Sequence, residues 1–197
     1  MSRSDAEIAT AVLAARDVFW RAGYDEASIE DIVAATGFNR YALYSEFGGK
    51  REVFLAALEQ YHEELKALFL SHLANLERPP MQAFRAVFEF AIDQIHARGR
   101  GSLMSNVAGD ISHRETIERE RIKAYLEDIT ASFVDALARA DARGELNENL
   151  DPEDAAMILV TLIMGLGTAA EHGTPLKQLK QTLDATLAAI SAPGKAY

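Results

Sequence analysis

The chain has 197 residues, of which 49% are hydrophobic and 25% charged, a balance typical of soluble globular proteins. Its formal net charge of -10 argues against non-specific coating of nucleic acid, although a small local basic site is compatible with that sum. Cysteine is absent, which excludes disulfides and thiolate metal sites. Acids interrupt the first apolar stretch, so no signal peptide is expected and we predict a cytoplasmic protein.

Apolar residues recur three and four positions apart along nearly the whole chain, which predicts an all-α fold. The first helix is predicted from Asp5 to Ala22, with Gly23 as its stop. A second helix begins after Ser28, which is suited to cap it, and ends at Gly37. A third, short helix follows with Asn39 as its cap. Two short helices joined by a few residues that include glycine are typical of a helix-turn-helix.

The second helix of this motif carries side chains suited to DNA. Arg40 and Tyr41 fall at its start, where a helix-turn-helix reaches base edges in the major groove. Arginine makes paired hydrogen bonds to guanine, and tyrosine offers a ring and a hydroxyl. Tyr44, one turn later, and Lys50, at the start of the next helix, are expected to hold phosphates. The bases between residues 37 and 51 outnumber the acids, which predicts a locally positive surface: Arg40, Lys50 and Arg51 against Glu46.

The middle of the chain predicts longer helices. One runs from Lys50 to Leu76, and the next, from Met81 to Ala97, is apolar over most of its circumference and is therefore expected to be central. A highly charged helix is predicted from Arg114 to Arg143. The apolar stripe of the first of these helices follows the helical period: Phe54, Leu58, Tyr61, Leu65, Leu68, His72 and Leu76.

A metal site is one alternative for this region. Glu59 and His62 have the Glu-x-x-His spacing of di-iron bundles, which need two such motifs and two further glutamates. The other near match has Asp110 and His113 in these positions. His62 lies off the apolar stripe among acids, which favours a solvated charged face. No nucleophile motif or phosphate-binding loop is found, so no metal, cofactor or enzymatic activity is expected.

The C-terminal part predicts a dimer interface. Asp151 and Pro152 open a helix whose apolar run, residues 155–170, is shorter than the ~20 residues that span a bilayer and is flanked by acids. We expect it to be buried on all sides, by its own core and by a second copy of the chain. The last helix, Leu176 to Ile190, lies beside it, which predicts a four-helix interface of two helices per subunit. The expected interface residues are Leu162, Gly165, Leu166, Ala169, Leu179, Leu183 and Leu187.

Over residues Ala11 to Leu58 the chain resembles the TetR/AcrR family of bacterial transcriptional repressors, on the stretch "SIEDIVAATGFNRYALYSEFGGKREVF". The resemblance implies a phosphate contact for Ser28 and contacts of Asn39, Arg40 and Tyr41 with bases or nearby backbone. It also implies phosphate contacts of Tyr44 and Lys50. Glu46 stands where many members have histidine, and because phosphate repels a carboxylate, we expect Glu46 to turn away.

The resemblance further implies a dimer through the last two helices and an effector pocket among the middle helices. The pocket candidates point to an apolar or aromatic effector, although they also fit a filled core. They are Phe88, Phe90, Met104, Tyr125, Met157 and Met164, with Gln94 and Asn106 as polar anchors.

The sequence therefore predicts an all-α protein of about nine helices. Residues 1–48 form a three-helix helix-turn-helix domain that binds DNA, and residues 49–197 form a larger helical domain that binds an effector and dimerises. The predicted function is a ligand-responsive repressor that binds a palindromic operator as a homodimer and is released by a small molecule. Two alternatives stay open: a helical small-molecule-binding protein that does not bind DNA, and a helix-bundle metal enzyme.

Overall fold

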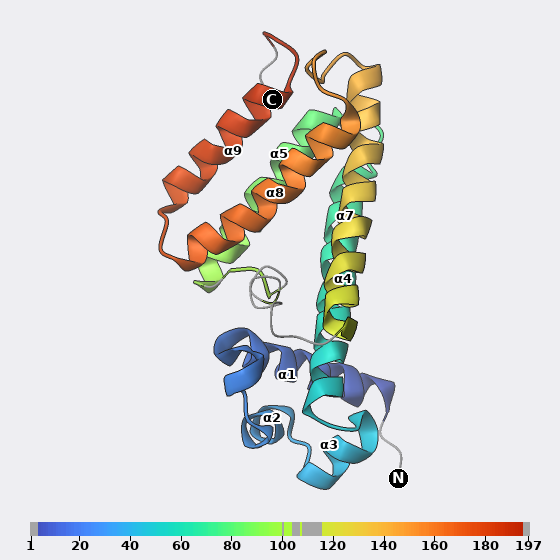
Figure 1. The fold of residues 1–197 in the computed structure, drawn as a ribbon, viewed down its shortest axis with the longest axis vertical. Coiled ribbons are helices and arrows are strands. Elements are labelled where there is room, and N and C mark those ends of the chain that lie inside the picture. Colours follow the sequence, from blue (N-terminus) through green and yellow to red (C-terminus); the bar gives the residue numbers. More distant parts are fainter. Residues whose placement is uncertain (1–3, 100, 104–106, 108–115, 195–197) are drawn as a thin grey trace.

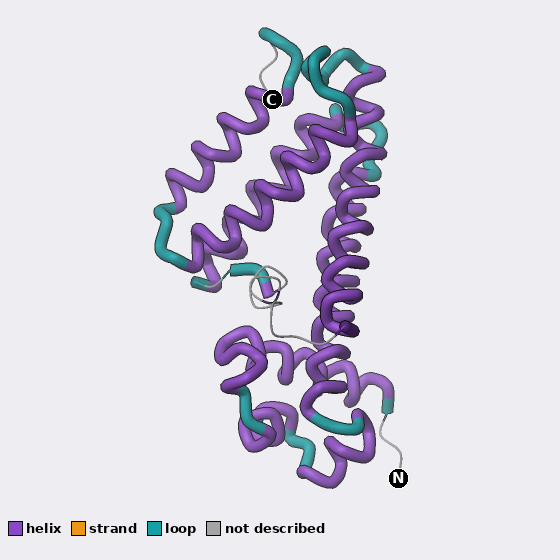
Figure 2. Tube along the Cα trace, viewed as in Figure 1, coloured by secondary structure: helices purple, strands orange, loops and turns teal. Residues whose placement is uncertain are grey.

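The computed structural model describes residues 4–99, 101–103, 107 and 116–194, and within these it contains eight α-helices and no strand (Figure 1). A single isolated bridge pairs Leu146 with Ser191. The trace shows helices joined by short loops throughout the described ranges (Figure 2). The all-α prediction is confirmed.

Three helices form the N-terminal part: α1 (Asp5–Glu26), α2 (Ile29–Thr36) and α3 (Arg40–Phe47). Ser28 caps α2 in a reciprocal box with Asp31, and the backbone of Gly37 at the end of α2 has φ 70°, a conformation that favours glycine. The backbone of Gly23 is not helical, with φ 75° and ψ 174°, so the regular helix is interrupted at the predicted stop and a short helical turn follows to Glu26.

Five helices follow: α4 (Lys50–Leu73), α5 (Pro80–Arg98), α7 (Thr116–Ala142), α8 (Pro152–Glu171) and α9 (Leu176–Ile190). Helix α4 leaves the N-terminal group and runs beside α7 (Figure 1). Helix α5 packs against α4, α7, α8 and α9, which fits its predicted central place. Leu76 lies beyond the end of α4 and is 72% exposed, so the predicted apolar stripe ends before it.

The N-terminal part is fixed to α4 by aromatic contacts from α1. Phe19 meets Phe54 edge to face at a centroid distance of 5.0 Å, and Trp20 meets Tyr61 in the same way at 5.0 Å. Such pairs contribute roughly 0.5–1.5 kcal/mol each beyond their buried area. A movement of α4 therefore acts directly on α1.

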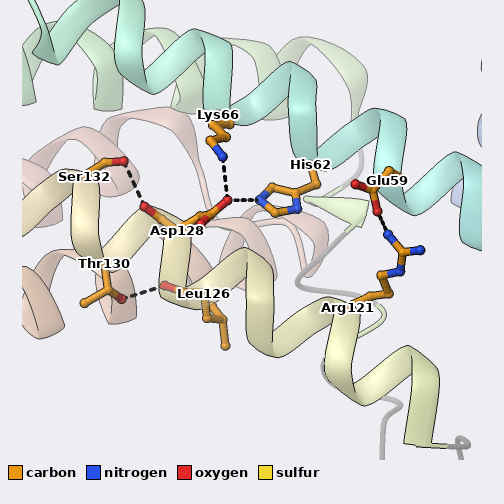
Figure 3. A network of polar contacts seen from close by, with 8 residues as sticks. All are labelled: Glu59, His62, Lys66, Arg121, Leu126, Asp128, Thr130 and Ser132. Carbon is orange, nitrogen blue, oxygen red and sulfur yellow. Dashed lines mark hydrogen bonds and ion pairs between the residues drawn. The ribbon is translucent and has the colours of Figure 1, made fainter.

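His62 does not lie on a solvated face as predicted, because its side chain is buried between α4 and α7 (Figure 3). Its ring packs edge to face on Tyr125, and its Nε2 lies 3.2 Å from Asp128 Oδ2. Lys66 Nζ donates to the same oxygen at 2.8 Å, and this bond holds the pKa of Asp128 below its ordinary value. The His62 ring is thus buried against α7, while the charged pairs between α4 and α7 stay half-exposed.

This cluster does not form a metal site. Glu59 pairs with Arg121 of α7 rather than with His62 (Figure 3). Within the described ranges, no group of three or more histidine and acidic side chains is placed to hold a metal ion. The second near match, with Asp110 and His113, lies outside the described residues.

Candidate functional site

Helix α3 packs on the protein through the buried Leu43 and exposes a polar face on its other side. Leu43 is 1% exposed and fixes the inner side of the helix, while the side chains of Tyr41 and Tyr44 are 83% and 46% exposed. The Asn39 side chain accepts the backbone N–H of Ala42 at 2.8 Å and so fixes the start of α3. An exposed helix start with an arginine and two tyrosines is suited to contact base edges.

Several predicted DNA contacts already have partners within the chain. The guanidinium of Arg40 lies 3.3 Å from a carboxylate oxygen of Glu30, with both side chains largely exposed. Ser28 Oγ donates to Asp31 at 2.6 Å, and this bond lowers the pKa of Asp31. The Arg40–Glu30 pair is on the surface, where solvent screens it, so Arg40 can exchange Glu30 for a base edge.

The predicted local positive surface is smaller than the sequence indicates. Arg51 faces α7, where its guanidinium donates to both carboxylate oxygens of Glu118 at 2.9 and 3.3 Å. Lys50 Nζ donates to the backbone carbonyl of Asp25 at 3.2 Å and lies 4.6 Å from the centroid of the Tyr24 ring. Lys50 therefore stays at the junction of α1 and α4, and Arg51 is removed from the candidate DNA surface.

A cavity of about 220 Å³ lies between α1, α4, α5, α7 and α8. Most of its wall is apolar or aromatic, as in small-molecule sites. Trp20 of α1 lines it, so the cavity touches the part of the chain that carries the helix-turn-helix. The apolar lining residues are Trp20, Leu65, Leu68, Phe69, Phe90, Ala91, Ile95, Ile163 and Met164, and the polar ones are Tyr61, Glu64, Gln94, Arg98, Ser102 and Tyr125.

The structure brings together about half of the predicted pocket residues. Phe90, Gln94, Tyr125 and Met164 line the cavity. Phe88 is fully buried in the core and Met157 is 57% exposed, and neither is among the lining residues. Met104 and Asn106 lie outside the described residues.

Sequence reasoning missed Trp20, Tyr61 and Arg98 as lining residues. Trp20 is the only tryptophan of the chain and lies near the end of the first predicted helix. Its Nε1 donates to the backbone carbonyl of Gly101 at 2.8 Å, which orients the indole beside the cavity. A large amphipathic ring in the helix that precedes a helix-turn-helix was the available signal.

The predicted dimer residues divide into two groups. Leu166, Leu179, Leu183 and Leu187 are at most 3% exposed within one protomer, so they belong to its own core rather than to an interface. Gly165 is exposed, and Leu162 and Ala169 are half-buried. The outer face of α8 and α9 is formed by other residues, including Met157, Ile158, Gln178, Gln181, Thr182, Ala185 and Ala189.

Helix α8 is therefore not covered on all sides by its own protomer. By length and composition it is the one helix in the described part of the chain that reaches the requirements of a membrane span. Only 39% of its apolar window is buried within the protomer. Its outer face is exposed, and the charged residues Glu153, Asp154 and Glu171 lie at the two ends of the helix.

Comparisons with known proteins agree with this geometry. Residues 12–57 match the family model "Bacterial regulatory proteins, tetR family", and residues 80–190, more than half of the chain, match "Tetracyclin repressor-like, C-terminal domain". The HTH-type transcriptional repressor ComR of Escherichia coli K12 is 27% identical over 175 residues, covering 88% of this chain and 83% of ComR.

Two solved structures share the fold. A cysteine mutant of the TetR-family regulator CifR, complexed with 26-base-pair operator DNA, is 25% identical with a TM-score of 0.77 and covers 92% of this chain and 95% of its own. A complex of SmeT with triclosan is 27% identical with a TM-score of 0.79 and covers 96% and 94%. The helix-turn-helix, the helical C-terminal part and both family matches lead to one conclusion: the chain belongs to the TetR family of bacterial regulatory proteins and is a DNA-binding transcriptional regulator.

Proposed function

We propose that this protein is a ligand-responsive repressor that binds a palindromic operator as a homodimer and leaves it when a small molecule fills the cavity. The observation that carries the proposal is the position of Trp20, which links the cavity to the helix-turn-helix. Trp20 lines the cavity from α1, and α2 packs against α1. The repressor ComR, the operator complex of CifR and the triclosan complex of SmeT support the same function.

In the DNA-bound state, we assign base contacts to Arg40 and Tyr41 and backbone contacts to Ser28, Asn39, Tyr44 and Lys50. Arg40 exchanges Glu30 for a guanine edge, since both partners of that surface pair are exposed. Glu46 is exposed on α3 and is expected to turn away from phosphate. Residues 1–48 then supply most of the DNA contacts and residues 49–197 most of the ligand cavity, with Lys50 and Trp20 as the exceptions, and both parts act in the cytoplasm.

The dimer forms through the outer face of α8 and α9. Met157 and Ile158 are 57% and 39% exposed there, and the small residues Gly165 and Ala185 allow a second copy to approach closely. An isologous contact of two helices per subunit buries this face around a two-fold axis. The two α3 helices then face half-sites about one helical turn, ~34–36 Å, or somewhat more apart.

The ligand acts through α4 and α1. It fills the space between Leu65, Leu68 and Phe90 and presses on the Trp20–Tyr61 contact that fixes α1 to α4. A shift of α4 changes the separation of the two α3 helices and lowers operator affinity. The coupling equals the difference in ligand affinity between the two states, typically ~1–3 kcal/mol.

Selection from random-sequence duplex DNA tests this function. Duplexes retained by the protein are sequenced, and we expect a palindrome with two half-sites. A helical ligand-binding protein that does not bind DNA would retain no preferred sequence. A metal enzyme would likewise fail to enrich DNA, and its activity would require an added metal ion.

A further inference from the structure

The charges that line the cavity are not balanced. Glu64 and Arg98 are its charged lining residues in the described part of the chain. Glu64 is neutralised from outside the cavity, because Arg16 of α1 lies 2.5 Å from its carboxylate and donates to Gln60 at 2.8 Å as well. Arg98 has no carboxylate within ion-pair distance among the described residues. In the described part of the chain, the cavity lining therefore carries one positive charge without a paired acid.

Arg98 is exposed, and no acid of the described residues pairs with the hydrogen-bonding edge of its guanidinium. Its central carbon lies 5.1 Å from the centroid of the Trp20 indole, a cation–π contact that fixes the group beside the cavity. Burial raises the pKa of the Tyr61 hydroxyl; the charge of Arg98 lowers this pKa and the charge of Glu64 raises it, with Arg98 the larger of the two effects. A stacked guanidinium retains the planar N–H fork that carboxylates bind in a bidentate way.

The remaining wall changes from apolar to polar along α5. Phe90, Gln94 and Arg98 are spaced four residues apart on one helix face, so they line the cavity in successive turns. The helix ends at Arg98, which lies beside Trp20, and Phe90 lines the cavity two turns earlier. A matching ligand has an apolar body beside Phe90 and Leu68 and a polar end beside Arg98 and Ser102.

We propose that the cavity binds a small apolar carboxylate whose anionic end is held by Arg98 next to Trp20. The inference rests on the proposed function, of which it names the effector class. An uncharged ligand leaves the guanidinium unused. A cationic ligand meets the charge of Arg98 and finds Glu64 already paired with Arg16.

Matched probes that differ only in charge test this inference. Three carboxylates, 4-phenylbutanoate, 3-cyclohexylpropanoate and octanoate, are compared with the corresponding amides and amines. Binding is followed by the fluorescence of Trp20, which is the only tryptophan of the chain and lines the cavity. We expect at least one carboxylate to bind about three- to fivefold more tightly than its amide, because Arg98 is exposed and solvent screens its pair with a carboxylate, and the amine to bind most weakly.

Three variants assign the preference to Arg98. Arg98→Gln should remove the difference between acid and amide while the amide affinity is kept, and Arg98→Lys should keep part of the preference. The control Arg78→Gln changes an exposed arginine between α4 and α5, outside the cavity lining, and should bind all probes as the unchanged protein does.

Three outcomes would overturn the assignment: no carboxylate binds better than its amide, Arg98→Gln retains the preference, or Arg98→Gln weakens acid and amide equally. Operator binding of the same samples separates this failure from that of the proposed function. If the protein binds its selected palindrome but prefers no carboxylate, only the effector class is wrong. If it binds no preferred DNA sequence, the proposed function fails whatever the probes do.

Discussion

A glutamate at Gly165 should separate the dimer without unfolding the protomer. Gly165 lies inside α8 on its outer face, and a side chain built there meets no atom of the protomer within 4 Å. Replacing glycine by glutamate in an exposed helix interior favours the helix by roughly 0.5 kcal/mol. The isolated protomer should therefore be as stable as before, or slightly more stable.

In the dimer the same substitution acts in the opposite direction. The two-fold axis brings both copies of the new carboxylate into the contact, where no basic residue of α8 faces them. An uncompensated buried charge costs ~3–5 kcal/mol, so even one such term raises the dimer dissociation constant at least about hundredfold.

Leu183→Ala is the matched control, because Leu183 is fully buried inside the protomer. Removing a buried leucine side chain lowers the free energy of unfolding by ~2–5 kcal/mol, but the outer face of α9 is unchanged. Sedimentation velocity and urea unfolding should therefore give opposite patterns: Gly165→Glu is a folded monomer, and Leu183→Ala is a less stable dimer. A Gly165→Glu protein that stays dimeric at micromolar concentration would refute the assigned face.

Further predictions concern DNA, acid stability and the junction of α1 with α4. Arg40→Ala should lose ~1–3 kcal/mol of operator binding per half-site, and less on a scrambled duplex. Lys50→Ala should weaken binding to both duplexes alike and flatten its salt dependence, which titrations at several salt concentrations will show. Because the pKa of Asp128 is lowered, its carboxylate stabilises the fold at pH values above the ordinary pKa of 3.8, and this contribution is lost as the pH falls below it. Asp128→Asn should therefore be slightly less stable than the unchanged protein at neutral pH and equally stable in acid. Thermal unfolding at several pH values will test this. Trp20→Phe loses the bond from Nε1 to a backbone carbonyl and should reduce unfolding free energy by ~1 kcal/mol in urea titrations. A loss of stability for Asp128→Asn that is the same at every pH, or no loss of stability for Trp20→Phe, would contradict these assignments.

The N-terminal elements could be predicted closely because their signals are local. Ser28 and Asn39 cap helices through bonds to residues three positions away, and Gly37 ends α2 through its own backbone conformation. Such contacts depend on a few neighbouring residues and are visible in the order of the chain. The periodic apolar stripes likewise predicted the long helices to within a few residues at most ends.

The partners of each helix face could not be predicted in this way. The polarity around His62 was read correctly, but its ring is buried against α7 and the charged pairs beside it are half-exposed. The apolar stripe of α9 was also found, but α9 has one such stripe and its own protomer uses it against α5 and α8. Which helix lies against which is set by contacts distant in sequence, and the same holds for Trp20 at the cavity.

The central claim is that two copies of α3 read two half-sites of one palindrome. The most direct measurement is a titration of the selected palindrome, of the same duplex with one half-site scrambled, and of a fully scrambled duplex, with the protein-to-DNA ratio determined at saturation. We predict two protomers per palindrome and an affinity that falls steeply with the first scrambled half-site. Equal affinity for all three duplexes, or saturation by a single protomer, would contradict the account.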